Sequence, residues 1–291
     1  MKTKYNIAIL GAIISAILYA ISVPISKILL KEIPPTIMAA LLYLGAGIGM
    51  SIIDLFRYKT GKVKMEMRLT SKEIPVTIGM VAVNIAAAIF LMIGLAMTTS
   101  ANASLLNNFE IVATSLIAFF IFKEEINKSL WVAIVLITVS SIILSVEDIS
   151  SFSFSFGSVF ILIACICWGL ENNFTRVLSV KDPLQVVVIK GFGSGLGSLI
   201  IALILNETAS NISYIIATLL LGFVSYGLSI FFYVYAQPEL GETKTSAYYA
   251  IAPFIGVGLS FVIFREIPTI SFVIGLLIMI VGTYFVSIDS K

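Results

Sequence analysis

Long apolar segments, separated by short polar clusters, follow one another along the whole chain. Breaks at charge clusters, prolines and Asn/Ser runs delimit ten of them, at residues 5–30, 34–56, 74–97, 100–122, 129–146, 156–178, 183–205, 212–236, 243–264 and 268–288. A helix needs about 20 residues to cross the roughly 30 Å hydrocarbon core of a bilayer. Merging two segments across the short connections at 98–99 or 265–267 would give more than 40 residues. The pattern therefore predicts an all-α integral membrane protein with ten transmembrane helices.

The composition of the chain agrees with a bilayer as its main solvent. Of the 291 residues, 59% are hydrophobic and 12% are charged, whereas a soluble domain carries about 25% charged residues. Histidine is absent from the sequence, which excludes His metal ligands and His acid–base chemistry. Cys165 and Cys167 lie two apart and point in different directions on a helix, so we interpret them as buried thiols. No metal site and no cofactor is predicted.

The distribution of Lys and Arg predicts how the helices are oriented. With both termini inside, three basic residues fall outside (Lys27, Lys31 and Arg265), Lys190 falls within the membrane, and the other fourteen of the 18 are cytoplasmic. The positive-inside rule favours this assignment. The cytoplasmic set is Lys2, Lys4, Arg57, Lys59, Lys62, Lys64, Arg68, Lys72, Lys123, Lys128, Arg176, Lys181, Lys244 and Lys291. We interpret the basic 57–72 loop as a topology signal and predict no nucleic-acid partner.

The N-terminal apolar run resembles a signal peptide in carrying Lys2 and Lys4 ahead of it. It continues to about Leu30, however, which is too long for the apolar part of a signal peptide, and it lacks a convincing cleavage site. We therefore predict that it is the first retained helix of a multi-pass protein. The expected location is the plasma membrane of a prokaryote, with both termini cytoplasmic.

The two halves of the chain carry matching landmarks. Residues 104–147 match 246–289 at a constant offset of 142, which places Phe122-Lys123-Glu124 on Phe264-Arg265-Glu266 and Ser104 on Ser246. Earlier in each half the offset is about 149, which places Lys27 on Arg176. The predicted repeats are 1–148 and 156–291. Because each holds five helices, an odd number, the second must enter the membrane upside down, an arrangement typical of secondary transporters.

Several motifs resemble those of EamA-type members of the drug/metabolite transporter superfamily. They are Cys167-Trp168-Gly169-Leu170-Glu171-Asn172-Asn173-Phe174-Thr175-Arg176, Lys181-Asp182-Pro183, Ile189-Lys190-Gly191, Tyr248-Tyr249-Ala250-Ile251-Ala252-Pro253-Phe254-Ile255-Gly256 and the two Phe-basic-Glu motifs. The resemblance implies alternating access and a central cavity lined mainly by helices other than the fifth and tenth. Its members move amino acids, metabolites and drugs. An acid-Pro pair is common in their helices four and nine, but here one copy has Glu110-Ile111 and the other Ala252-Pro253.

Charged residues inside the apolar segments are the first candidates for function, because charge in a membrane helix is costly. Glu171 lies seven residues before the end of its segment, and Lys190 lies seven residues after the start of the next one. Both should therefore lie roughly 10 Å inside the cytoplasmic boundary, where they can form an ion pair. Such a pair either fixes helix packing or belongs to a substrate site or gate.

Glu110 lies near the middle of its segment, just after Asn107 and Asn108, and has no obvious partner in the sequence. A carboxyl group at this depth can bind an amine, carry a proton or coordinate Na⁺. The alternative is a protonated acid that is hydrogen-bonded to a neighbouring helix.

Other polar residues complete the predicted site. Tyr249 occupies the position equivalent to Asn107, so Tyr248 or Tyr249 is expected to line the same cavity. The amides of Asn84, Asn172 and Asn173 either contact substrate or hydrogen-bond neighbouring helices. Pro24 and Pro253 are expected to interrupt helices one and nine. Pairs of glycines four residues apart, Gly191/Gly195, Gly193/Gly197 and Gly45/Gly49, predict close approach between helices.

These features predict a secondary active transporter of a small metabolite, amino acid or drug-like compound, working by alternating access. Export is the expected direction, with proton coupling or exchange as the driving force. The predicted partners are a small-molecule substrate, the lipid bilayer and either a proton or a counter-substrate. The alternatives are an integral-membrane enzyme acting on lipid-linked substrates and a passive channel. The spans lack HExxH, GxSxG and paired-aspartate motifs, so the chain is not predicted to be an enzyme.

Overall fold

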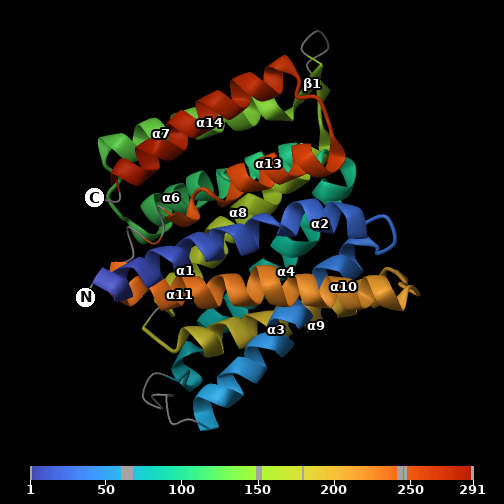
Figure 1. Ribbon diagram of the computed structural model, residues 1–291, viewed down its shortest axis with the longest axis vertical. Helices are drawn as coiled ribbons and strands as arrows, with labels where there is room; N and C mark the ends of the chain where they lie inside the picture. Colours follow the sequence, from blue (N-terminus) through green and yellow to red (C-terminus); the bar gives the residue numbers. More distant parts are fainter. Residues whose placement is uncertain are drawn as a thin grey trace.

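The computed structural model describes residues 2–59, 68–148, 153–178, 180–240, 245 and 248–289. In these ranges the chain is almost entirely helical, and the longer helices lie side by side across the molecule (Figure 1). In chain order the elements are α1 (Lys2–Ala20), α2 (Ser22–Leu29), α3 (Pro35–Lys59), η2 (Ser71–Glu73), α4 (Ile74–Met97), α5 (Ser100–Leu106), α6 (Phe109–Phe122), α7 (Lys128–Ser145), β1 (Val146–Asp148), β2 (Ser153–Phe154), α8 (Phe156–Val177), α9 (Pro183–Ile204), α10 (Ile212–Gly222), η3 (Phe223–Leu228), α11 (Ser229–Leu240), α13 (Ala252–Phe264) and α14 (Ile270–Asp289).

The predicted crossings agree with these helices to within a few residues. Nine helical stretches of the described chain are long and apolar enough to span a membrane, and α13 is a shorter apolar helix of 13 residues. The predicted segment 243–264 therefore contains α13, but its first residues lie outside the described ranges, as does Ser246 of the repeat alignment. The two short strands pair antiparallel, with Val146 opposite Phe154, and form a small hairpin between α7 and α8. The fold class is all-α apart from this hairpin.

Several crossings are interrupted or locally widened. The first crossing is divided into α1 and α2 at Ile21. Pro24 has no N–H, and its ring prevents the usual helical hydrogen bond to the carbonyl group four residues earlier. The eighth contains the π-helical segment η3, a wider turn that often marks functional sites. In the ninth, Pro253 is the second residue of α13, where a missing N–H costs little. The interruptions expected at Pro24 and Pro253 are thus present in the described chain.

The fourth crossing is also broken, at a position where the apolar pattern predicted a continuous helix. Helix α5 ends at Leu106 and α6 begins at Phe109, with Asn107 and Asn108 forming the turn between them. No proline is present here. The side-chain amide of Asn108 donates to the backbone oxygen of Leu105 at 3.1 Å, a local bond that competes with the helical hydrogen-bond pattern.

Helix packing follows the predicted relation between the two halves. In that relation α1/α2 corresponds to α8, α3 to α9, α4 to the α10–α11 stretch, α5/α6 to α13 and α7 to α14. Helix α4 packs along α8, and correspondingly α11 packs along α1. Helix α6 packs on α8, just as α13 packs on α1 and α2, while α3 pairs with α9 and α7 with α14. Such an exchange of partners is expected of two inverted repeats.

The equivalent helix ends are built in the same way in both halves. Lys123 and Arg265, the central residues of the two Phe-basic-Glu motifs, both adopt left-handed backbone conformations, with φ of 59° and 54°, and end α6 and α13. The next helix of each half starts from a side-chain cap: Asn127 accepts from the N–H of Leu130, and Thr269 accepts from the N–H of Phe272. Each of these pairs is separated by 142 residues, so the repeat extends to local backbone geometry.

Glycines let α3 approach its neighbours closely, as their spacing predicted. A Cβ atom added at Gly191 of α9 would lie 2.6 Å from the Cα atom of Gly47 in α3. One added at Gly45 would lie 2.0 Å from the backbone oxygen of Leu219 in α10. Only glycine fits at these contacts, because no Cβ can be that close to another backbone atom.

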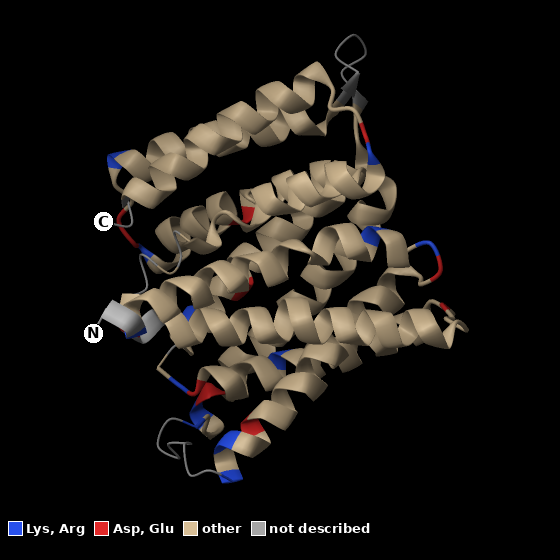
Figure 2. Ribbon diagram, viewed as in Figure 1, with Lys and Arg blue, Asp and Glu red and all other residues tan. Residues whose placement is uncertain are grey.

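Charged residues gather at the two ends of the helices and are sparse between them (Figure 2). Both chain termini lie on one side of the molecule, called here the terminal side (Figure 1). Ion pairs there join Arg57 to Asp182 at 3.2 Å and Lys181 to Glu73 at 3.2 Å. Four of the basic residues predicted for this side, Lys62, Lys64, Lys244 and Lys291, lie outside the described ranges.

Candidate functional site

The ion pair predicted between Glu171 and Lys190 is present. The Lys190 ammonium on α9 donates to Glu171 Oε2 on α8 at 2.9 Å, and the Thr175 hydroxyl donates to the second carboxylate oxygen. Glu171 is only 1% exposed. Because both charges are matched and hydrogen-bonded, the pair is electrically balanced inside the bundle.

Glu110, at the start of α6, has a partner that the sequence did not suggest. The amide of Asn172 on α8 donates to Glu110 Oε1 at 2.7 Å and also reaches the Thr114 hydroxyl at 3.1 Å. That hydroxyl in turn donates to the backbone oxygen of Glu110 at 2.8 Å. The carboxyl group of Glu110 is therefore held by a neutral amide, whereas Glu171 is paired with a cation.

Asn84 on α4 connects four helices. Its side-chain oxygen accepts from the Tyr43 hydroxyl at 3.0 Å and from the Trp168 indole N–H at 3.1 Å, and its amide donates to the Ser194 hydroxyl at 2.8 Å. Asn84 is fully buried. With oxygen and nitrogen both engaged, this residue acts as an interhelical hydrogen-bond centre for α3, α4, α8 and α9.

Tyrosine rings from both halves meet in the centre of the bundle. Tyr19 lies 6.0 Å from Tyr226 and 5.5 Å from Tyr249, measured between ring centroids, and Tyr43 lies 5.3 Å from Tyr226. We call these four residues the tyrosine cluster. Tyr248 lies outside it and packs against Ala8, Ala12, Ala236 and Leu240, between α1 and α11.

The break in the fourth crossing adds an unpaired side-chain oxygen to this region. Asn107 and Asn108 are 6% and 2% exposed, and the side-chain oxygen of Asn107 has no hydrogen-bond partner within the described chain. The Cys165 thiol on α8 lies 3.6 Å from the backbone oxygen of Leu106 and donates to it. Cys165 is buried and free, as interpreted from the sequence, whereas Cys167 is free but only partly buried.

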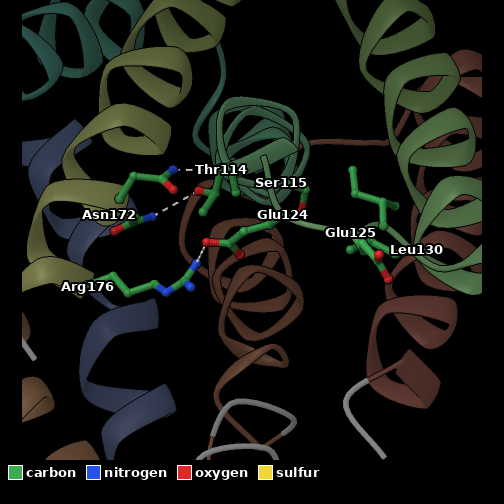
Figure 3. Close-up of a pocket in the computed structure, with 10 residues that line it drawn as sticks. Thr114, Ser115, Glu124, Glu125, Leu130, Asn172 and Arg176 are labelled. Carbon is green, nitrogen blue, oxygen red and sulfur yellow. Dashed lines mark hydrogen bonds and ion pairs between the residues drawn. The ribbon is translucent and has the colours of Figure 1, made fainter. Parts of the chain in front are cut away.

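Two cavities border these residues. The smaller, about 30 Å³, lies between Tyr43, Tyr226 and Lys190. The larger, about 180 Å³, lies between α6, α8 and the start of α7, where Asn172 and Arg176 face Thr114 and Glu124 (Figure 3). Among the described residues no group of three or more Cys, Asp or Glu side chains is placed to hold a metal ion.

Comparison with known proteins identifies the family. The sequence profile of the EamA-like transporter family matches residues 6–146 and 155–288, which is most of the chain. The chain belongs to the EamA-like transporter family. It is 27% identical over 299 aligned positions to an uncharacterized transporter of Methanothermobacter thermautotrophicus, covering 97% of this chain and 86% of that one. It is also 24% identical over 200 positions to the uncharacterized transporter YyaM of Bacillus subtilis, covering 65% of each chain.

A solved crystal structure supports the fold of this EamA-like transporter. It superposes with a TM-score of 0.70 at 16% identity and covers 98% of this chain and 97% of the other. At this identity the likeness concerns the fold alone. The chain is thus a multi-pass membrane transporter of a family with prokaryotic members.

The structure brings most of the predicted site residues of this EamA-like transporter into one region. Glu110 contacts Asn172, which follows Glu171 on α8, and Glu171 holds Lys190. Tyr249 joins the tyrosine cluster, and Asn84 reaches it through the Tyr43 hydroxyl. Asn107 and Asn108 border the cluster's helices at the break between α5 and α6.

Sequence reasoning missed several residues of this region, namely Tyr19, Tyr43, Tyr226, Thr114 and the ion pair between Arg176 and Glu124. Aromatic residues in apolar segments usually only pack, so three tyrosines carried no separate signal. Arg176 and Glu124 were visible as landmarks of the repeat, but nothing in the sequence showed that they meet.

Proposed function

We propose that this chain is a secondary active transporter that exports a small metabolite, amino acid or drug-like compound by alternating access, driven by proton coupling or by exchange. The proposed halves are the five-helix repeats 1–148 and 156–291. The protein is proposed to lie in the plasma membrane with its terminal side facing the cytoplasm. Family membership supports transport in general, and the finer statements rest on the arrangement of the central residues.

One observation carries the proposal: polar and aromatic groups from both halves meet between the helices, where they are buried or half-buried. Glu110, Tyr19 and Tyr43 come from the first half, whereas Asn172, Lys190, Tyr226 and Tyr249 come from the second. Carboxyl and ammonium groups are costly in a membrane, and they are retained where substrates or ions bind. A site shared by two inverted repeats can be exposed to either side when one repeat rocks against the other.

The charges suggest separate roles for the two acids. Glu171 is paired with Lys190, so the pair contributes no net charge to the site. Glu110 accepts a hydrogen bond from a neutral amide and is therefore the acid available for a proton or for the amine of a cargo molecule. The breaks in the first and fourth crossings provide backbone that can bend when the halves move.

The proposal is tested with purified protein in liposomes, a panel of metabolites, amino acids and drug-like amines, and experiments with and without a pH gradient. Wild type should move at least one compound, recovered chemically unchanged, and unlabelled compound on the opposite side should accelerate the movement of labelled compound. Glu110→Gln should slow this flux by about tenfold or more. Glu32→Gln is the matched control, because Glu32 is exposed between α2 and α3.

Three results would contradict the proposal. Flux without saturation and without acceleration from the opposite side would indicate a channel. Chemical conversion of a panel compound would indicate an enzyme. A protein that moves no panel compound and no proton, and whose Glu110→Gln variant behaves as wild type in cells, would remove the basis for coupled transport.

The proposed orientation has its own test. In a background with Cys165 and Cys167 replaced by serine, single cysteines are introduced at Lys4 and Glu32, which are exposed on opposite sides of the molecule. A membrane-impermeant thiol reagent added to intact cells should label Glu32→Cys and leave Lys4→Cys unlabelled. The reverse labelling would place the terminal side outside.

A further inference from the structure

The larger cavity lies apart from the tyrosine cluster. Its walls are Thr114, Ser115 and Ala118 of α6, Glu124, Glu125 and Ile126 of the following link, Leu130 of α7, and Asn172, Asn173 and Arg176 of α8. None of the four clustered tyrosines lines it. At about 180 Å³ and with hydroxyl, amide and charged groups in its walls, it has the room and the polarity to hold several water molecules.

One end of the cavity faces the terminal side. There Arg176 and Glu124 form an ion pair, and their side chains are 61% and 35% exposed (Figure 3). The opposite end is closed by Asn172 and Thr114, which are hydrogen-bonded to each other at 3.1 Å. The cavity therefore extends from the exposed C-terminal end of α8 towards Asn172 and Thr114.

Glu110 lies directly behind the Asn172 amide, at 2.7 Å. A single side chain thus lies between the cavity and the half-buried carboxyl group of Glu110. The titratable groups whose charges act on Glu110, or on which its charge acts, come from several surrounding elements and are Glu171, Lys190, Cys165, Tyr19, Tyr43, Tyr226 and Tyr249. Lys190 already neutralises Glu171, and the thiol and phenols are neutral near pH 7 at their ordinary pKa values, which leaves Glu110 as the group that can exchange a proton here.

In the described chain, the equivalent junction of the other half lacks these polar groups. The repeat alignment places Ala252 opposite Glu110, Gly256 opposite Thr114 and Val23 opposite Asn172. None of these carries a polar side chain. Moreover, a Cβ atom added at Gly256 would lie 2.9 Å from the Ser104 hydroxyl oxygen, so α13 packs closely on α5 at the position equivalent to Thr114.

We propose that the larger cavity is a water-filled entrance through which Glu110 exchanges its proton with the terminal side only, with the Asn172 amide as the barrier between the water and the carboxyl group. The proton passes from cavity water to a Glu110 carboxylate oxygen and leaves by the reverse step, so water is the only co-reactant. The inference rests on the coupling role proposed for Glu110.

Infrared spectroscopy of the protein in lipid tests the entrance without knowledge of the cargo. The carboxyl stretch of protonated Glu110 is identified as the band that Glu110→Gln lacks, and its rate of hydrogen–deuterium exchange is measured over a range of pH. Ala118→Leu fills the cavity and should slow this exchange by about tenfold or more. Asn172→Ala removes the barrier and should accelerate exchange by at least about threefold.

Asn6→Ala is the matched control. Asn6 is exposed on α1 and does not line the cavity, so its loss should leave the exchange rate within about twofold of wild type. If Ala118→Leu does not fold, the smaller Ala118→Val should slow exchange in the same direction.

Three outcomes would overturn the entrance: an unchanged rate when the cavity is filled, a rate that Asn172→Ala lowers or leaves unchanged, or the absence of a Glu110 carboxyl band over the whole pH range in which the protein is folded. Exchange is measured without cargo, so its result is separate from the transport assay. Transport of panel compounds with unaltered exchange in the filled variants would refute the entrance and leave the proposed function standing. Altered exchange without transport of any panel compound would support the entrance and count against the proposed transport function.

Discussion

The junction of α6 with α8 and the junction of α13 with α2 occupy equivalent places in the two halves, yet their side chains differ. The first holds Glu110, Thr114 and Asn172 around a cavity. The second has Ala252, Gly256 and Val23 and is closely packed, with Gly256 against Ser104 and the backbone oxygen of Ala20. Both helices nevertheless end at a basic residue in the left-handed backbone conformation, Lys123 for α6 and Arg265 for α13.

This difference shows that the two repeats share their helix arrangement and helix ends but not their polar side chains. The hydrogen-bonded carboxyl and amide groups occur around α6, in the first copy, and not at the equivalent positions around α13. A carboxyl group between helices requires donors and room around it, and of these two junctions the described residues supply both at α6–α8. At the equivalent position in the second half, Gly256 instead lets α13 pack closely on α5 and on the end of α1. Four sets of substitutions can break or sharpen this comparison, and all are measured as free energies of unfolding in detergent titrations.

The largest loss of unfolding free energy is expected on breaking the ion pair between Glu171 and Lys190, which lies beside the α6–α8 junction. The alignment places Ser22 opposite Glu171, so the second junction has no such ion pair. Glu171→Gln or Lys190→Gln alone leaves a buried charge without its partner and should cost about 3–5 kcal/mol. The charge-swapped double variant should recover part of this loss. Equal damage from both single variants and the swap would exclude a stabilising ion pair.

The second-largest loss of stability is expected when a carboxyl group is introduced at Ala252, the position in the second half that is equivalent to Glu110. Ala252 is fully buried against Ala16 and Ala20, so Ala252→Glu introduces an acid without donors and should cost about 3 kcal/mol. The reciprocal Glu110→Ala should cost less, because Asn172 keeps its bond to Thr114. If Ala252→Glu proved as stable as wild type, the second junction would have hidden room and the contrast would fail.

Volume alone can be tested at the next pair of positions. Gly256→Thr places a Cβ atom 2.9 Å from the Ser104 hydroxyl oxygen and should cost about 2 kcal/mol by overpacking. Thr114→Ala at the equivalent site enlarges an existing cavity and removes one hydroxyl, for which about 1 kcal/mol is expected. A larger cost for Thr114→Ala than for Gly256→Thr would reverse the packing argument.

The smallest effects concern the basic residues at the two junction ends. Lys27 donates to the backbone oxygens of Leu95 and Ala96 at the end of α4, at 2.7 and 3.1 Å. Lys27→Gln should therefore cost about 1.5 kcal/mol, since it removes charge-assisted bonds to unpaired helix carbonyls. Arg176→Gln breaks only an exposed ion pair with Glu124 and should cost at most about 0.5 kcal/mol. Comparable losses from the two variants would show that the Arg176 pair is stronger than an ordinary surface pair.

Much of the fold could be predicted from the sequence. The length of each apolar segment predicts one membrane crossing. The segment 74–97, for example, coincides with helix α4. Counting residues from the helix ends placed Glu171 and Lys190 at one depth, and the structure pairs them at 2.9 Å. The break at Asn107 and Asn108 was not predicted, because asparagine is tolerated within helices and breaks them only when the surroundings accept its local bonds.

The candidate site was predicted less completely than the fold. The residue types were found, but not their partners: Asn172 was left undecided between substrate contact and helix packing, and it proves to hold Glu110. Asn84 was likewise undecided, and its bonds to Tyr43, Trp168 and Ser194 occupy both ends of its amide. Whether these residues bind cargo remains a proposal for the transport assay.

The sequence by itself determined the crossings, the two-repeat plan and the matched level of Glu171 and Lys190, because bilayer thickness sets the length of a crossing and helix rise converts position along the chain into position along the helix. Only the tertiary structure decided which side chains meet: the Asn172–Glu110 bond, the tyrosine cluster and the cavity beside α6. Those contacts depend on how each helix is rotated and how closely it packs against its neighbours. A shift of one or two ångströms in that packing forms or removes a hydrogen bond, and the order of residues in the chain does not specify it.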